Sequence, residues 1–62
     1  DSFRRSIVST RAIKAGEVIQ RSDIDFKRPG IGITPGDIHY VLGRTVKTDV
    51  EMDQPIFRDQ LL

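Results

Sequence analysis

A core made from this chain has to form without disulfide bonds, because none of its 62 residues is cysteine. A domain of about 60 residues buries only about 60% of the surface that its unfolded chain exposes, so its stability is marginal. Domains this small usually depend on a disulfide, a metal or a partner. The chain has one histidine, and the spacing of its carboxylates does not indicate a zinc site. The sequence therefore predicts an unusually economical core, a partner, or both.

The apolar residues favour strands over helices. Ile and Val together number 13, against three Leu and two Ala. Branched side chains fit a pleated surface and lose rotamer freedom in a helix. No apolar run approaches the roughly 20 residues of a membrane-spanning helix, and no signal peptide is recognisable. We expect one mostly β domain over residues 1–62, located in the cytoplasm, without a membrane partner.

The charge balance argues against a nucleic-acid partner. Ten basic and nine acidic residues give a net charge of +1, whereas nucleic-acid binders normally present a strongly basic face. Seven of the ten bases are arginine. Arginine is preferred where a planar fork has to hold a carboxylate, a phosphate or a carbonyl group.

Short extended segments alternate with turns along the chain. Gly16 is available for a positive φ in the first turn, and Ser22 can cap a single helical turn. We expect strands or extended segments at residues 4–10, 18–19, 25–28, 44–50 and 55–57, turns at 14–17 and 51–54, and helical turns at 22–24 and 58–61.

One short helix is expected between Thr34 and Gly43. Thr34 can cap its start, Pro35 fits the first helical position, and Asp37 can complete a capping box. Gly43 can end it in the left-handed conformation. The apolar face of this helix comprises Ile38, Val41 and Leu42.

The chain shows an internal similarity between residues 13–24 and 50–61, which are 37 residues apart. The matching positions are Ile13 with Val50, Ile19 with Ile56, Arg21 with Arg58 and Ile24 with Leu61. The preceding strands match only with a one-residue slip. The similarity predicts two halves related by a pseudo-twofold axis, each burying the apolar face of the other.

No pattern of an enzyme is present. Residues 30–32 lack the third glycine of a dinucleotide fingerprint. His39 falls on the polar side of the expected helix. Asp23 and Asp25 flank Ile24, but an acid–base pair needs a cleft and shifted pKa values, for which so small a domain has little room. We expect no catalytic residue and no metal ligand in this domain.

The loop at residues 29–33 is the segment most suggestive of binding. It contains two isoleucines, Ile31 and Ile33, which we expect to fold back onto the core or to meet a partner. Arg28 stands just before Pro29, whose ring fixes the backbone φ. A preorganised arginine loses less entropy when it binds a planar acceptor, so Arg28 is the candidate binding residue.

At these residues the chain resembles the antifreeze-like (SAF) domain found at the C-terminus of bacterial sialic acid synthases. The motifs that carry the resemblance are Arg-Arg-Ser-Ile-Val at residues 4–8 and Lys-Arg-Pro-Gly-Ile-Gly-Ile at 27–33. Shorter matches occur at residues 13–17, 42–44 and 59–61. The similarity covers essentially the whole chain.

The resemblance implies a β-clip fold, also that of type III antifreeze proteins, with pseudo-twofold short strands, one short helix and single 3-10 turns. It implies a domain excised from a larger TIM-barrel N-acetylneuraminate synthase, which condenses phosphoenolpyruvate with N-acetylmannosamine. The catalytic residues and a divalent metal, manganese or magnesium, would lie in the missing barrel.

In that family this domain caps the barrel of the neighbouring subunit in a homodimer, without being catalytic itself. The resemblance assigns to Arg28 the binding of the N-acetyl group of the sugar substrate, and places Phe3 near the same site. The alternatives are the same module in a legionaminic acid, pseudaminic acid or spore-coat polysaccharide synthase, or a pure interaction module for protein or carbohydrate. Ice binding is not expected, because the matching region carries several charges: Lys14, Glu17, Arg21 and Asp23.

Overall fold

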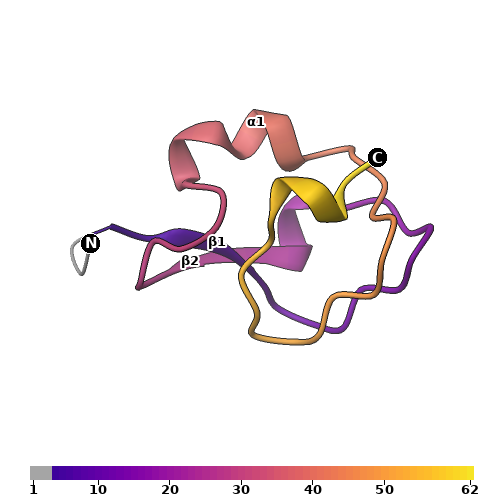
Figure 1. Ribbon diagram of the computed structural model, residues 1–62, viewed down its shortest axis with the longest axis horizontal. Coiled ribbons are helices and arrows are strands. Elements are labelled where there is room, and N and C mark those ends of the chain that lie inside the picture. The colour runs from indigo at the N-terminus through magenta and orange to yellow at the C-terminus, as the bar shows by residue number, and fades with distance from the viewer. Residues whose placement is uncertain (1–3) are drawn as a thin grey trace.

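A computed structural model describes residues 4–62 of the chain, which form a two-stranded sheet, one short helix and single 3-10 turns (Figure 1). In chain order the elements are β1 (Ser6–Ser9), η1 (Arg21–Asp23), β2 (Ile24–Lys27), η2 (Pro35–Asp37), α1 (Ile38–Val41) and η3 (Arg58–Gln60).

The sheet pairs two of the predicted extended segments, residues 4–10 and residues 25–28. β1 runs antiparallel to β2, with Ser6 opposite Lys27 and Ser9 opposite Ile24. All four residues of β1 are buried, and its second edge is covered by a bridge between Val8 and Pro55. β1 is therefore the central strand, although it is shorter than the predicted segment 4–10.

The internal similarity of the sequence corresponds to a pseudo-twofold axis in the structure. Ile13 and Val50, which match each other in the repeat, exchange two backbone hydrogen bonds of 2.8 and 2.7 Å. A residue that pairs with its own equivalent lies on the axis. The 3-10 turns η1 and η3 are also 37 residues apart at both ends. The predicted pairing of two halves around one core is confirmed.

The one-residue slip in the sequence match of the preceding strands is not a slip in the structure. Ser9 donates its amide proton to Gln54 O at 3.0 Å, and Val46, 37 residues after Ser9, donates to Glu17 O at 3.0 Å. Gln54 in turn lies 37 residues after Glu17. The spacing of 37 therefore extends through the strands, because backbone hydrogen bonds preserve a register that side-chain identity has lost.

The expected strand at residues 44–50 is not continuous. Its bridges go to three separate segments: Thr45 to Val18, Val46 to Leu61 and Val50 to Ile13. Because each partner belongs to a different part of the chain, no two successive residues share a ladder. The β-branched residues of this segment correctly indicated extended backbone, but the segment forms isolated bridges rather than a regular strand.

The short helix forms where it was predicted, with different end contacts. Pro35 occupies the first position of η2, which leads directly into α1, and Gly43 follows with φ +82°. Thr34 makes no capping hydrogen bond. Asp37 forms an ion pair with Arg58 at 3.3 Å rather than a capping box.

The first helical turn is also capped differently from the prediction. η1 begins at Arg21, so Ser22 is not its N-cap. The Gln20 amide instead donates to Asp23 Oδ2 at 2.9 Å. At the equivalent place in the second half, the Phe57 amide donates to Gln60 Oε1 at 2.9 Å, so both turns are closed by a side chain from their last residue.

The core consists almost entirely of β-branched residues from both halves. Ile33 is 4% exposed and joins this core, whereas Ile31 is 58% exposed. The buried cluster comprises Ile7, Ile13, Ile19, Ile24, Ile33, Val41, Val46, Val50, Ile56 and Leu61. Among residues 4–62, no helix is both long and apolar enough to cross a membrane.

Candidate functional site

Arg28 lies on the surface immediately after β2. Its side chain is exposed and makes no hydrogen bond or ion pair with any other residue of 4–62. It is therefore available to a ligand. Phe3, the second candidate, lies outside the described residues.

The backbone on both sides of Arg28 is held by one buried hydroxyl group. Ser6, which is 1% exposed, directs Oγ toward Pro29 O at 2.8 Å and Lys27 O at 3.2 Å. Ile31 donates its amide proton to Pro29 O at 3.1 Å. The loop that carries Arg28 is thus fixed at the residue before and the residue after it.

The two loop glycines allow the backbone to approach its neighbours closely. A Cβ atom at Gly30 would lie 2.6 Å from Arg4 Cβ, and one at Gly32 would lie 2.6 Å from Ile56 O. Real Cβ atoms do not approach other atoms this closely, so the loop can adopt this position only with glycine at both sites.

Two hollows flank the exposed Ile31. The one that contains Arg28 has a volume of about 290 Å³ and is lined also by Pro29 and Pro55. Its Lys27 and Asp53 pair with each other at 2.6 Å, which raises the pKa of Lys27. Arg28 therefore supplies the unpaired charge of this hollow.

The second hollow is larger, about 470 Å³, and lies on the other side of Ile31. Its lining includes Phe57 and Asp59, and the ion pair of Arg58 with Asp37. Arg58 is therefore already engaged. We place the candidate site at the smaller hollow, where a free guanidinium is found.

Four other arginines are engaged within the protein. Arg21 lies 5.2 Å from the centre of the Phe26 ring. Arg44 and Arg58 lie 4.5 and 4.7 Å from the centre of the Tyr40 ring. These contacts are cation–π interactions. Together with Arg11, they show that most arginines of the chain stabilise the fold.

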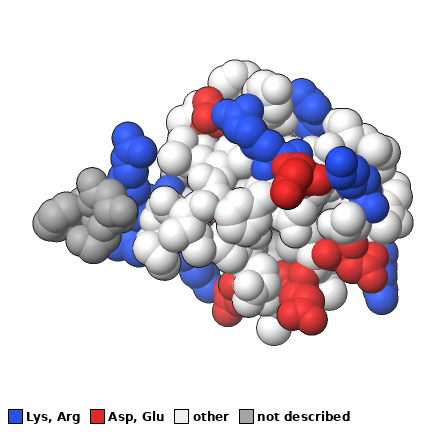
Figure 2. All heavy atoms as spheres, in the orientation of Figure 1, with Lys and Arg blue, Asp and Glu red and all other residues white. Residues whose placement is uncertain are grey.

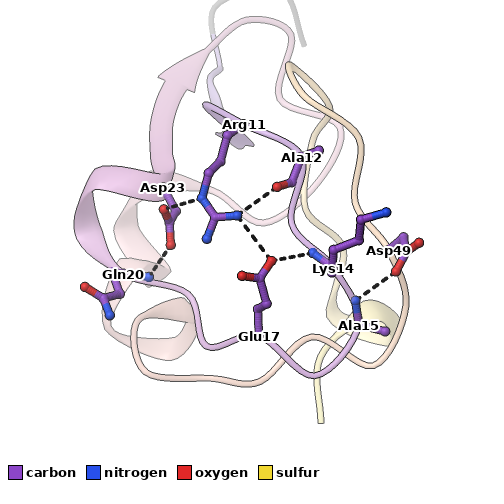
Figure 3. A network of polar contacts seen from close by, with 8 residues as sticks. All are labelled: Arg11, Ala12, Lys14, Ala15, Glu17, Gln20, Asp23 and Asp49. Carbon is purple, nitrogen blue, oxygen red and sulfur yellow. Dashed lines mark hydrogen bonds and ion pairs between the residues drawn. The ribbon is translucent and has the colours of Figure 1, made fainter.

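Arg11 is the centre of a polar network in the first half (Figure 3). Its guanidinium donates to Asp23 at 3.0 Å and to Glu17 at 3.2 Å. Hydrogen bonds from the Gln20 amide and from Arg11 lower the pKa of Asp23, and those from the Lys14 amide and Arg11 lower the pKa of Glu17. Both carboxylates stay ionised to hold the turn and η1 together, as a structural network does.

The remaining candidates for chemistry do not come together. His39 and Asp25 are exposed on different elements, and Asp23 is held in the Arg11 network. Within residues 4–62, no three His, Cys, Asp or Glu side chains gather as metal ligands would. The divalent metal that the resemblance implies is expected in the barrel rather than in this domain, and this stays a prediction.

Sequence reasoning identified Arg28 but missed Ser6 and the neighbouring Arg4 and Arg5 as parts of its surroundings. A serine in a strand gives no signal of its own that it anchors a loop 23 residues away. The only signal was the position of all three within the Arg-Arg-Ser-Ile-Val motif.

The chain is similar to a protein of Methanocaldococcus jannaschii, described as uncharacterised, with 48% identity over 59 residues. That match covers 95% of this chain and 18% of the relative. It is also similar to the crystal structure of a protein from Chromobacterium violaceum that is described as spore coat polysaccharide biosynthesis protein E. There the TM-score is 0.85 with 27% identity, covering 98% of this chain and 19% of the other.

These matches extend across the sheet, the loop and both halves of the repeat, so the predicted fold is confirmed. The chain spans less than one fifth of the length of either protein. The SAF domain family model matches residues 4–62, which include the Arg28 loop and its Ser6 anchor. The chain therefore belongs to the SAF domain family.

Proposed function

We propose that this SAF domain is a non-catalytic, substrate-capping part of a sialic acid synthase-type enzyme. In this proposal the enzyme condenses phosphoenolpyruvate with N-acetylmannosamine, and a TIM barrel that follows the family's pattern supplies catalysis and the divalent metal. The observation that carries the proposal is Arg28: an exposed guanidinium, unpaired within residues 4–62, on a loop anchored at both of its neighbours.

The physical basis is preorganisation. A guanidinium on a fixed backbone loses little entropy when it meets a planar acceptor such as the carbonyl of an N-acetyl group. In the proposed dimer, Arg28 extends from this domain into the active site of the neighbouring subunit. The exposed Ile31 and the hollow beside it would face that barrel. Phe3 is proposed to lie near the same site.

The experiment is Arg28→Ala in the full-length protein that carries this domain. Loss of a charge-assisted contact predicts that kcat/KM falls about 30- to 150-fold with N-acetylmannosamine and phosphoenolpyruvate. Lys47→Ala is the control, because Lys47 is also an exposed base but lies outside the loop. Unchanged kcat/KM in Arg28→Ala would contradict the role given to Arg28.

A second candidate is the same module in a spore-coat polysaccharide synthase, or in one making legionaminic or pseudaminic acid. The name of the Chromobacterium protein favours the first of these. Activity of the full-length protein on a panel of N-acetylated sugars distinguishes them. A pure interaction module predicts no turnover with any sugar, and a change in assembly in Arg28→Ala.

A further inference from the structure

Three arginines without a partner lie at one end of the molecule. Arg4, Arg5 and Arg28 are exposed, and none of their side chains forms a hydrogen bond or ion pair with the other residues of 4–62. The four other arginines are all engaged. The unpaired charge of the arginines is thus concentrated rather than spread over the surface.

The register of the sheet brings the backbone of these three residues to the same end of the sheet. Ser6 and Lys27 form the last pair of the ladder, so Arg5 and Arg28 each stand one residue beyond it. The loop also packs closely against Arg4, because a Cβ at Gly30 would be 2.6 Å from Arg4 Cβ. Figure 1 shows the start of β1 and this loop at the same end, and Figure 2 shows Lys and Arg side chains there.

This concentration of charge is not needed by the fold. Like charges placed opposite each other at a sheet end are destabilising, and the nearby Asp53 is already paired with Lys27. In the repeat, the positions 37 residues after Arg4 and Arg5 are Val41 and Leu42. There the second half carries the end of α1 instead of extended backbone, so the repeat itself does not require a positive charge at Arg4 and Arg5.

We propose that Arg4, Arg5 and Arg28 form an oxyanion site, which binds a phosphate or carboxylate group of a small-molecule ligand. Guanidinium groups match both anions with paired, charge-assisted hydrogen bonds. The proposal rests on the proposed function and adds to it: beside the N-acetyl group that Arg28 is proposed to bind, the bound ligands present a separate anionic group to this end of the domain. Three bases on a chain of net charge +1 fall short of the clusters that bind membranes or nucleic acid.

The experiment is a titration of the 62-residue chain with inorganic phosphate, followed by NMR signals of the arginine Nε–H groups at constant ionic strength. Constant ionic strength removes the general screening effect of added salt. We expect the signals of Arg4, Arg5 and Arg28 to shift with one shared midpoint of about 1–10 mM, a weak affinity for a surface site. Arg11 and Arg44 should not shift with them. Acetate should act at the same residues with a higher midpoint, since it carries less charge.

The matched variants are Arg5→Gln and Lys47→Gln, which remove the same charge inside and outside the cluster. Arg5→Gln should raise the phosphate midpoint at least about threefold, with Lys47→Gln close to the parent and Arg5→Lys intermediate. Parallel shifts at all arginines, no saturation, or equal effects of the two glutamine variants would overturn the proposal. This result is independent of the Arg28→Ala activity test, so either proposal can fail alone.

Discussion

At the scale of single residues, Ser6 shows how a buried hydroxyl group positions an exposed side chain. It lies in the central strand and reaches the carbonyl groups on both sides of Arg28. Ser9, three residues later in the same strand, holds the second half in a similar way through Gln54, whose amide donates to its Oγ at 3.3 Å. No buried side-chain polar atom of residues 4–62 is left without a partner.

Ser6→Ala removes this anchor: Pro29 O keeps only the Ile31 amide as a donor, and Lys27 O loses its contact with the hydroxyl group. We expect the free energy of unfolding, measured with urea, to fall by about 1–2 kcal/mol. Ser22→Ala, at an exposed serine, should stay within about 0.5 kcal/mol. If Ser6 positions Arg28, the heteronuclear NOE of the Gly30 and Ile31 amides must also fall. Lower stability with an unchanged NOE would restrict Ser6 to a structural role.

At the scale of elements, the turns at residues 14–17 and 51–54 each contain a residue with positive φ at the equivalent position. Gly16 has φ +94°, and Asp53, its equivalent 37 residues later, has φ +66°. Both donate an amide proton across the axis, Gly16 to Val46 O at 2.8 Å and Asp53 to Ser9 O at 3.0 Å. The turns therefore set the register between the halves.

Gly16→Ala tests the conformational requirement without a steric contribution. A Cβ at Gly16 would meet nothing within 4 Å, so the cost is that of a positive φ in an L-residue, about 1–2 kcal/mol of unfolding free energy. Gly36→Ala is the matched control: its Cβ also meets nothing, and its φ is not positive. That variant should keep or gain up to about 1 kcal/mol. Equal unfolding free energies of the two variants would contradict this explanation.

At the scale of the whole molecule, the two halves complete a single core. The buried residues come from both halves and from the loop and helix between them. Because Ile13 and Val50 bond to each other on the axis, neither half can close its core alone. This arrangement explains how so short a chain folds without disulfide bonds, and it leaves the loop and helix free to differ between the halves.

Ile13→Ala should destabilise the entire chain. A buried isoleucine truncated to alanine costs about 2–5 kcal/mol, a large part of the few kcal/mol expected for a domain of this length. Ile31→Ala makes the same chemical change at a side chain that is 58% exposed, and should change stability by less than about 1 kcal/mol. Urea unfolding followed by NMR should show both halves unfolding together. Separate transitions for the halves would contradict a shared core.

Much of the backbone was predictable because it depends on local chemistry. Pro35 and Gly43 mark the ends of the helical region as expected, and the repeat predicted the pseudo-twofold axis, on which the structure places Ile13 and Val50. The errors concern contacts between distant residues. Asp37 was expected to cap a helix, but Arg58, 21 residues away, offers it a charge-assisted partner.

The candidate site divides in the same way. The sequence by itself determined that Arg28 precedes a rigid Pro29–Gly30 loop, that most apolar residues favour strands, and that the chain repeats after 37 residues. Only the tertiary structure decided that Ser6 fixes this loop and that Arg4 and Arg5 lie beside it. It also decided which arginines are already engaged. The reason is physical: propensity acts between neighbours in sequence, whereas burial, register and charge pairing depend on distance in space.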